Sequence, residues 1–156
     1  MDVVDWIGAW PGARLLQRSA LAYLLVNAAH ILAIGLVLGA ILPLDIRLMG
    51  VLRGPPLAAI GPFLSRAAAV GVAFALATGG LLFSVKPDDY LANAAWRWKM
   101  ALLLLALAAV AIQHANPAFK AALQGGPLAL GVRATAFASA GLWLGVLVAG
   151  RWIGFL

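Results

Sequence analysis

Two histidines are the side chains of this sequence best suited to chemistry. His30 and His114 are the only histidines among 156 residues. A neutral imidazole can ligate haem iron, copper or zinc, and it can also carry protons near neutral pH. His30 lies near the middle of a long apolar stretch, where ionisable side chains are rare and usually face protein. Two interpretations stay open: a ligand or proton carrier, or a histidine hydrogen-bonded across helices to Thr78 or Ser139.

Tyr23 and Asn27 extend the polar face that His30 occupies. The three residues are spaced i, i+4 and i+7, so they share one face of a helix. On an otherwise apolar helix, such a polar stripe predicts that this face contacts protein rather than lipid. We therefore place Tyr23 and Asn27 beside His30 as candidate cofactor-binding residues.

His114 is the candidate second metal ligand, but its expected depth differs from that of His30. His30 lies about 11 residues into its expected span and His114 about 18 into its own, an offset of roughly 10 Å along parallel helices. A tilted helix, or a first span that begins at Pro11, would reduce this offset. The alternative is a histidine at a helix C-terminus that interacts with the helix dipole.

Two cations could bind the acidic groups of a cofactor. Lys99 and Arg47 lie at expected span ends, where they could pair with propionates, phosphates or lipid headgroups. The alternative for each is a side chain whose charged end reaches the membrane surface. Thr135 and Ser139 form an i, i+4 pair that indicates either a polar seam or ordinary packing.

The elements that must position these side chains are membrane spans. The chain is 65% hydrophobic and 10% charged, against about 45–50% and about 25% in soluble domains, and its mean hydropathy is +1.02. It contains no cysteine, which excludes disulfides, thiolate metal sites and cysteine nucleophiles. It also contains no glutamate, which argues against a carboxylate-bridged pair of metals in the bundle core.

Hydrophobic runs predict an all-α protein, an integral membrane four-helix bundle with short loops and an N-terminal interfacial helix. We expect one transmembrane domain over 1–156, with spans at about 19–44, 63–85, 96–114 and 133–150. Pro43 should kink or end the first span. Asp88 or Asp89 should cap a short helix. The first half of the 116–132 loop should form another interfacial helix.

Charge and glycine spacing add to this prediction. The acidic N-terminus and the lack of a cleavage site argue against a removed signal peptide. The net charge of +6 is spread over both ends of the spans, which indicates lipid contact rather than nucleic-acid binding. Four spans place both termini on the same side of the membrane.

GxxxG spacing favours close packing of helices within the bundle, with a dimer face as the alternative. This spacing occurs at Gly35/Gly39, Gly141/Gly145 and Gly150/Gly154.

Two stretches resemble a known superfamily of small four-span bacterial membrane proteins. These are His30-Ile-Leu-Ala…Gly39…Pro43-Leu-Asp45-Ile-Arg47-Leu48, and Trp98-Lys99 followed by an apolar run to His114. The superfamily includes protoporphyrinogen oxidases of the HemJ type and CopD copper-resistance membrane domains. The resemblance implies a bacterial inner-membrane location and a haem region at His30 and Lys99.

The first functional hypothesis is a membrane haem b protein that transfers electrons or oxidises a membrane-soluble substrate. A redox partner or quinone would then be its partner. The alternatives are copper handling of the CopD type and a non-catalytic scaffold subunit of a larger membrane complex or homo-oligomer. Soft copper(I) prefers sulfur ligands, and this chain has three methionines and no cysteine. An oligomeric pore is a further alternative, although no span has a polar face from end to end.

Overall fold

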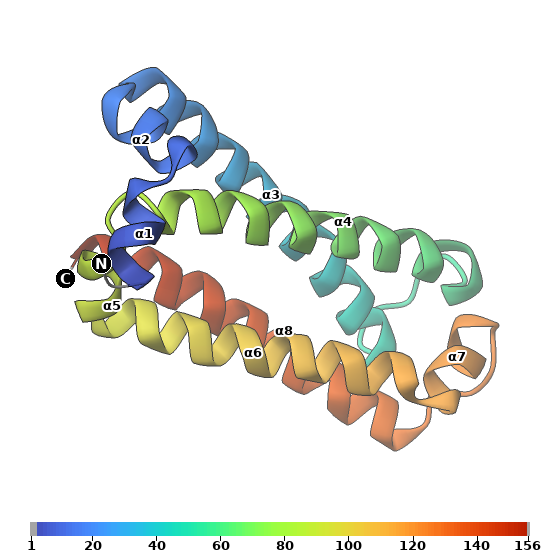
Figure 1. Cartoon of the computed structure of the whole chain (residues 1–156). Helices are drawn as coiled ribbons and strands as arrows, with labels where there is room; N and C mark the ends of the chain where they lie inside the picture. The colour runs from blue at the N-terminus through green and yellow to red at the C-terminus, as the bar shows by residue number, and fades with distance from the viewer. Residues whose placement is uncertain (1–2, 156) are drawn as a thin grey trace.

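The structure, a computed structural model, describes residues 3–155 and contains helices joined by short connections (Figure 1). These are α1 (Val3–Ala9), α2 (Pro11–Arg18), α3 (Ala20–Leu48), α4 (Leu57–Phe83), α5 (Pro87–Ala92), α6 (Ala94–Ala115), α7 (Pro117–Leu123), α8 (Leu130–Trp152) and a 3₁₀ turn η1 (Ile153–Phe155). In this part of the chain, α3, α4, α6 and α8 are long and apolar enough to cross a membrane. The prediction of an all-α bundle is confirmed.

The first two long helices extend further than the sequence indicated. The sequence predicts that Pro43 either ends or kinks the first span. The first of these predictions is wrong, because α3 continues through Pro43 to Leu48. The expected start of the second span at residue 63 is also too late, because α4 begins at Leu57 and includes Pro62. A proline removes one hydrogen bond of its own helix, and neighbouring helices commonly compensate for this loss within a membrane bundle.

Short polar side chains mark several helix starts. The side chains of Ser19, Asn93 and Asn116 accept hydrogen bonds from the first turns of α3, α6 and α7. The expected short helices α5 and α7 are present. The prediction that Asp88 or Asp89 caps α5 is wrong, because both lie inside its first turn. Pro87 starts this helix, and the two carboxylates next to it interact favourably with the positive end of the helix dipole.

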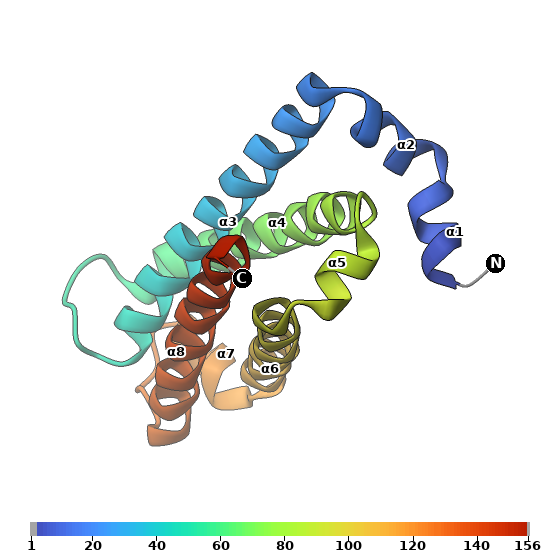
Figure 2. The same ribbon diagram turned by 90° about the vertical axis from the view of Figure 1, so that its left-hand side faces the viewer.

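The long helices form two pairs. α3 packs mainly against α4, α6 packs mainly against α8, and contacts between α3 and α8 join the pairs. The buried apolar clusters draw on the C-terminal half of α3 and on α7, and include Val37, Ile41, Leu48, Phe119 and Trp143. The N-terminal half of α3 instead extends away from α6 and α8 (Figure 2), and Leu21, Leu24, Leu25, Ile31 and Leu32 are exposed there.

Close approach between helices occurs at a glycine outside the GxxxG pairs. A Cβ atom on Gly71 of α4 would lie 3.0 Å from the backbone nitrogen of Val37 and 3.3 Å from the carbonyl oxygen of Ala33. The expected packing role is wrong for Gly35 and Gly39, since a Cβ atom there would meet nothing within 4 Å. Gly71 therefore lets α3 and α4 pack backbone against backbone.

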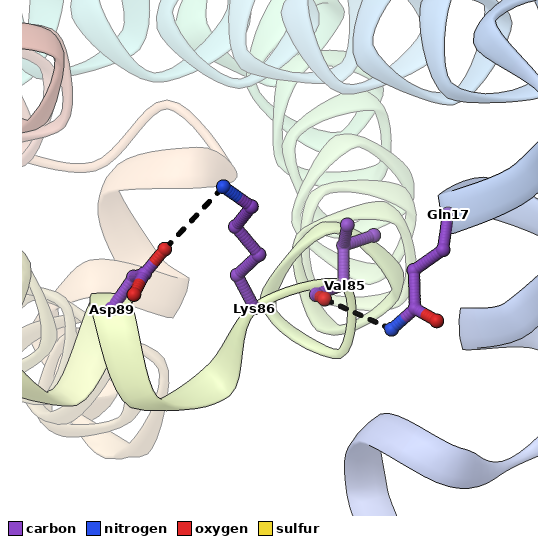
Figure 3. Close-up of polar contacts among 4 residues, drawn as sticks. All are labelled: Gln17, Val85, Lys86 and Asp89. Carbon is purple, nitrogen blue, oxygen red and sulfur yellow. Dashed lines mark hydrogen bonds and ion pairs between the residues drawn. The ribbon is translucent and has the colours of Figure 1, made fainter.

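The N-terminal helices are attached to the turn between α4 and α5. The Gln17 side-chain amide donates hydrogen bonds to the carbonyl oxygens of Gly8 (3.2 Å) and Val85 (3.0 Å). Figure 3 shows the second of these bonds beside the exposed ion pair between Lys86 and Asp89 (3.6 Å). Helix α1 and η1 consequently lie at the same end of the bundle, as Figure 1 shows.

Candidate functional site

His30 is held at the contact between α3 and α4. Its Nδ1 atom lies 2.8 Å from the hydroxyl oxygen of Thr78, and that hydroxyl donates its proton to the carbonyl oxygen of Phe74 at 2.6 Å. Because a hydroxyl has one proton, Thr78 must accept a hydrogen bond from Nδ1–H. In the neutral imidazole, Nε2 therefore carries the lone pair.

Gly79 provides the space that the imidazole ring occupies. A Cβ atom at this position would lie 3.1 Å from Cε1 of His30. Since Gly79 directly follows Thr78, one short segment of α4 both binds the ring and accommodates it. The sequence interpretation of a histidine hydrogen-bonded across helices to Thr78 is confirmed, and Ser139 is not its partner. This bond is compatible with ligation, because metal-binding histidines usually donate their other ring N–H to a second group.

Lys99 lies on the same side of the bundle as His30. It is half-buried, and it acts electrostatically on the imidazole. A Cβ atom on Gly150 of α8 would lie 3.5 Å from Cε of Lys99, so its aliphatic stem crosses this glycine. The structure therefore brings together the histidine and the lysine that the sequence paired.

The outer part of the polar stripe is more open than the sequence indicated. Asn27 is exposed, so the prediction that this face contacts protein is wrong for this residue. Tyr23 is 36% exposed, and its hydroxyl is hydrogen-bonded to that of Tyr90 in α5. Burial, and then the neighbouring Tyr23 hydroxyl, raise the pKa of Tyr90 above its ordinary value. Asn27 and Tyr23 thus leave an open polar surface beside His30.

Arg47 and His114 are placed away from this group. Arg47 lies 17 residues beyond His30 in the sequence of α3, about 25 Å along a helix. Its guanidinium donates hydrogen bonds to the carbonyl oxygens of Leu52 and Pro55 in the loop that follows. This arrangement fits a role in holding the loop rather than in binding a cofactor at His30.

His114 lies near the C-terminal end of its helix, as the alternative interpretation of the sequence predicts. It is exposed, its Nδ1–H donates to the Val110 carbonyl oxygen in its own helix (2.9 Å), and its ring packs against Phe119 with centroids 5.0 Å apart. It lies close to the end of α6, at Ala115, whereas Lys99 lies near the beginning. The structure brings His30 to Lys99 and does not bring His114 to either.

Sequence reasoning missed the burial of Asp45. Its position beside Arg47, near the expected end of the first span, indicates the membrane interface, but Asp45 is only 5% exposed, and Ser139 of α8 hydrogen-bonds its carboxyl group. A signal was present in the sequence. Ile41, Leu44 and Leu48 flank it at helical spacing, so Asp45 lies on an apolar face of α3 that becomes buried.

Comparison with protein-family models, with curated proteins and with solved structures finds no match for this chain. Within residues 3–155, no cluster of three or more His, Cys, Asp or Glu side chains could hold a metal ion. The fold therefore defines the class, an all-α protein with four helices in the described chain able to cross a membrane. The His30 group is its candidate site.

Proposed function

We propose that this protein binds haem b in the membrane, with His30 as the protein ligand to iron. The observation that carries the proposal is the orientation of the imidazole, whose Nδ1–H is bound by Thr78. This bond directs the lone pair to Nε2, the atom that would ligate iron. The resemblance of the His30 and Lys99 stretches to the HemJ type supports the same assignment.

The residues around His30 fit a single histidine ligand together with a cationic partner. Lys99 would pair with a propionate, and the open surface at Tyr23 and Asn27 would accept the edge of the macrocycle. His114 lies elsewhere and would not supply a second ligand. When bound, haem would supply one-electron chemistry, for electron transfer or for oxidation of a membrane-soluble substrate. The chain would hold it in an apolar environment.

The test is an optical spectrum of the full-length protein, purified from cells supplied with haem. We expect a Soret band in the wild type and its loss in His30→Ala. The matched control is His114→Ala, which should retain the band because His114 is exposed at the other end of α6. A wild-type protein without a Soret band after haem supplementation overturns the proposal. A His30→Ala protein that keeps full haem content removes the ligand assignment.

A scaffold role is the second candidate. The observation that favours it is the exposed apolar surface on the N-terminal half of α3, which includes Leu21, Leu25 and Leu32. A partner span could pack there. A partner that co-purifies in stoichiometric amount, and is lost in a Leu25→Gln variant, would support this role. Purification as a partner-free monomer from native membranes would argue against it.

A further inference from the structure

A second feature lies closer to the α7 end of the bundle than His30 does. A cavity of about 510 Å³ is lined by side chains of α3, α4, α6, α7 and α8. His30 does not line it. The cavity is of the size of small-molecule sites, which are about 300–1,000 Å³, so it could hold a ligand independently of the proposed haem site.

The walls of this cavity are mainly hydrocarbon, with a few buried polar groups among them. Apolar contact comes from side chains such as Ile41, Leu76, Leu107 and Phe119. Six lining residues carry a polar side-chain atom, namely Asp45, Ser65, Gln113, His114, Ser139 and Trp143. Apolar walls with a small number of placed polar groups are characteristic of ligand sites.

Several of these polar groups have unused hydrogen-bonding capacity. Asp45 is 5% exposed and Gln113 is 7% exposed. Ser139 binds the carboxyl group of Asp45, yet Oδ2 of Asp45 has no partner, and neither does Oε1 of Gln113. The Gln113 amide nitrogen donates to the carbonyl oxygen of Val132, which fixes Oε1 as the free end. Ser65 Oγ and Trp143 Nε1 also have no partner, and among these groups Asp45 Oδ2 and Gln113 Oε1 are the oxygens that can only accept.

Asp45 also lacks a cation. The ion pair seen in the described chain joins Lys86 and Asp89 at the other end of the bundle. The basic side chain that lines the cavity is His114, and its Nδ1–H is bound to Val110. An unpaired buried carboxylate is destabilising, and a cation that binds it in a medium of low dielectric gains a strong, charge-assisted hydrogen bond.

From these observations, we infer that the cavity binds a lipophilic amine as its ammonium ion. The N–H groups would donate to Asp45 Oδ2 and Gln113 Oε1, and the hydrocarbon part would lie against the leucine, isoleucine and phenylalanine side chains. A neutral alcohol of the same shape would fill the same walls and could donate one hydrogen bond, but it would leave the charge of the carboxylate uncompensated. The site should therefore discriminate by charge rather than by shape.

The experiment uses two probes of matched shape, 1-aminoadamantane and 1-adamantanol. Binding is measured by equilibrium dialysis against the full chain in phosphatidylcholine nanodiscs, with empty nanodiscs as the blank. We expect saturable binding of the amine, about tenfold or more tighter than binding of the alcohol, because the ammonium ion compensates the buried charge of Asp45, whereas the alcohol can only donate one hydrogen bond to it. Equal affinity for the two probes, or no binding of the amine above the blank, overturns the inference.

Two variants locate the site. Asp45→Asn should weaken amine binding by about tenfold or more and leave alcohol binding nearly unchanged. Asp89→Asn, which removes the same charge from an exposed position, is the matched control and should bind as the wild type does. If Asp45→Asn does not fold, Ala69→Leu replaces it, since Ala69 lines the cavity from an exposed position. If the folded Asp45→Asn protein, or the Ala69→Leu protein used in its place, binds the amine as tightly as the wild type does, the assignment of the amine site to this cavity is overturned.

Discussion

At the scale of residues, the hydroxyl group of Thr78 determines how the His30 ring presents its nitrogens. Thr78→Val keeps the side-chain shape but removes the acceptor for Nδ1–H. A buried donor left without its partner costs about 1–3 kcal/mol. We expect a corresponding loss in the free energy of unfolding, measured by SDS titration in mixed micelles. The weakened orientation of the ring should also lower haem occupancy.

Thr135→Val is the matched control for this change. The Thr135 hydroxyl donates to the carbonyl oxygen of Gly131 in its own helix at 2.8 Å, and it binds no second helix. We expect a loss of at most about 0.5 kcal/mol, typical of a surface substitution. Equal losses in the two variants would show that the bond between His30 and Thr78 adds no stability.

Tyr90 provides a prediction about alkaline pH. Its pKa is raised above 10.0 in the folded protein, first by burial. The unfolded chain loses this proton at lower pH, so the contribution of Tyr90 to stability is complete below pH of about 10 and falls as the pH rises further. Thermal unfolding from pH 8 to 11 should show a decline in wild-type Tm that is shallower in Tyr90→Phe. Parallel curves for the two proteins would contradict this linkage.

The sequence predicted the contacts of His30, the central residue of the candidate site, more accurately than the burial of the residues around it. An ionisable side chain in an apolar span predicts a bonded partner, and Thr78 was among those expected for His30. Asn27 and Asp45 were misjudged for one reason. Helical spacing shows which residues share a face, but the burial of that face depends on which helices pack against it. That depends on tertiary contacts.

At the scale of helices, Gly71 sets the separation between α3 and α4. In Gly71→Ala the added Cβ atom would lie 2.9 Å from Cγ2 of Val37 and 3.0 Å from its backbone nitrogen. Because backbone cannot move aside as a flexible side chain can, we expect a loss of about 1–3 kcal/mol, as for other overpacked cores. Unfolding in mixed micelles measures this loss.

Gly39→Ala is the control for the same substitution in open space. A Cβ atom there meets nothing within 4 Å, and alanine has the higher helix propensity, by about 1 kcal/mol. This variant should therefore be as stable as the wild type or more so. A loss as large as that of Gly71→Ala would indicate that Gly39 packs against another chain in the membrane.

The existence of the four long helices was predictable, but the ends of two were not. Apolar runs long enough to cross a bilayer predict spans directly. Prolines made the first span appear too short and the second appear to start too late, since a local rule treats proline as a helix breaker. In the folded protein, α3 and α4 continue through Pro43 and Pro62 while they pack against each other.

At the scale of the whole molecule, packing is concentrated towards the α7 end. The apolar clusters join α3, α4, α6, α7 and α8 there, and the cavity that contains Asp45 lies among them. The sequence could not predict this asymmetry, because it shows that each span is apolar enough to cross a membrane but not which parts of the spans pack against one another. The His30 group and the Asp45 cavity are therefore two sites in different environments, the first beside the exposed surface of α3 and the second in the more closely packed part of the bundle.

The arrangement of the helices also predicts the topology in the membrane. Four crossings would place Arg18 and Gly154 on one side, and Gly54 and Gln124 on the other. The chain contains no cysteine, so a cysteine introduced at any one of these exposed positions is the only thiol. In sealed inverted vesicles, a membrane-impermeant maleimide should label Arg18→Cys and Gly154→Cys alike. Gly54→Cys and Gln124→Cys should show the opposite accessibility, and lysis of the vesicles with detergent should expose all four.

Labelling of Arg18→Cys and Gly154→Cys from opposite sides would mean an odd number of crossings. In that case one of the four long helices lies in the membrane surface, where it could not form the bundle that places Lys99 near His30.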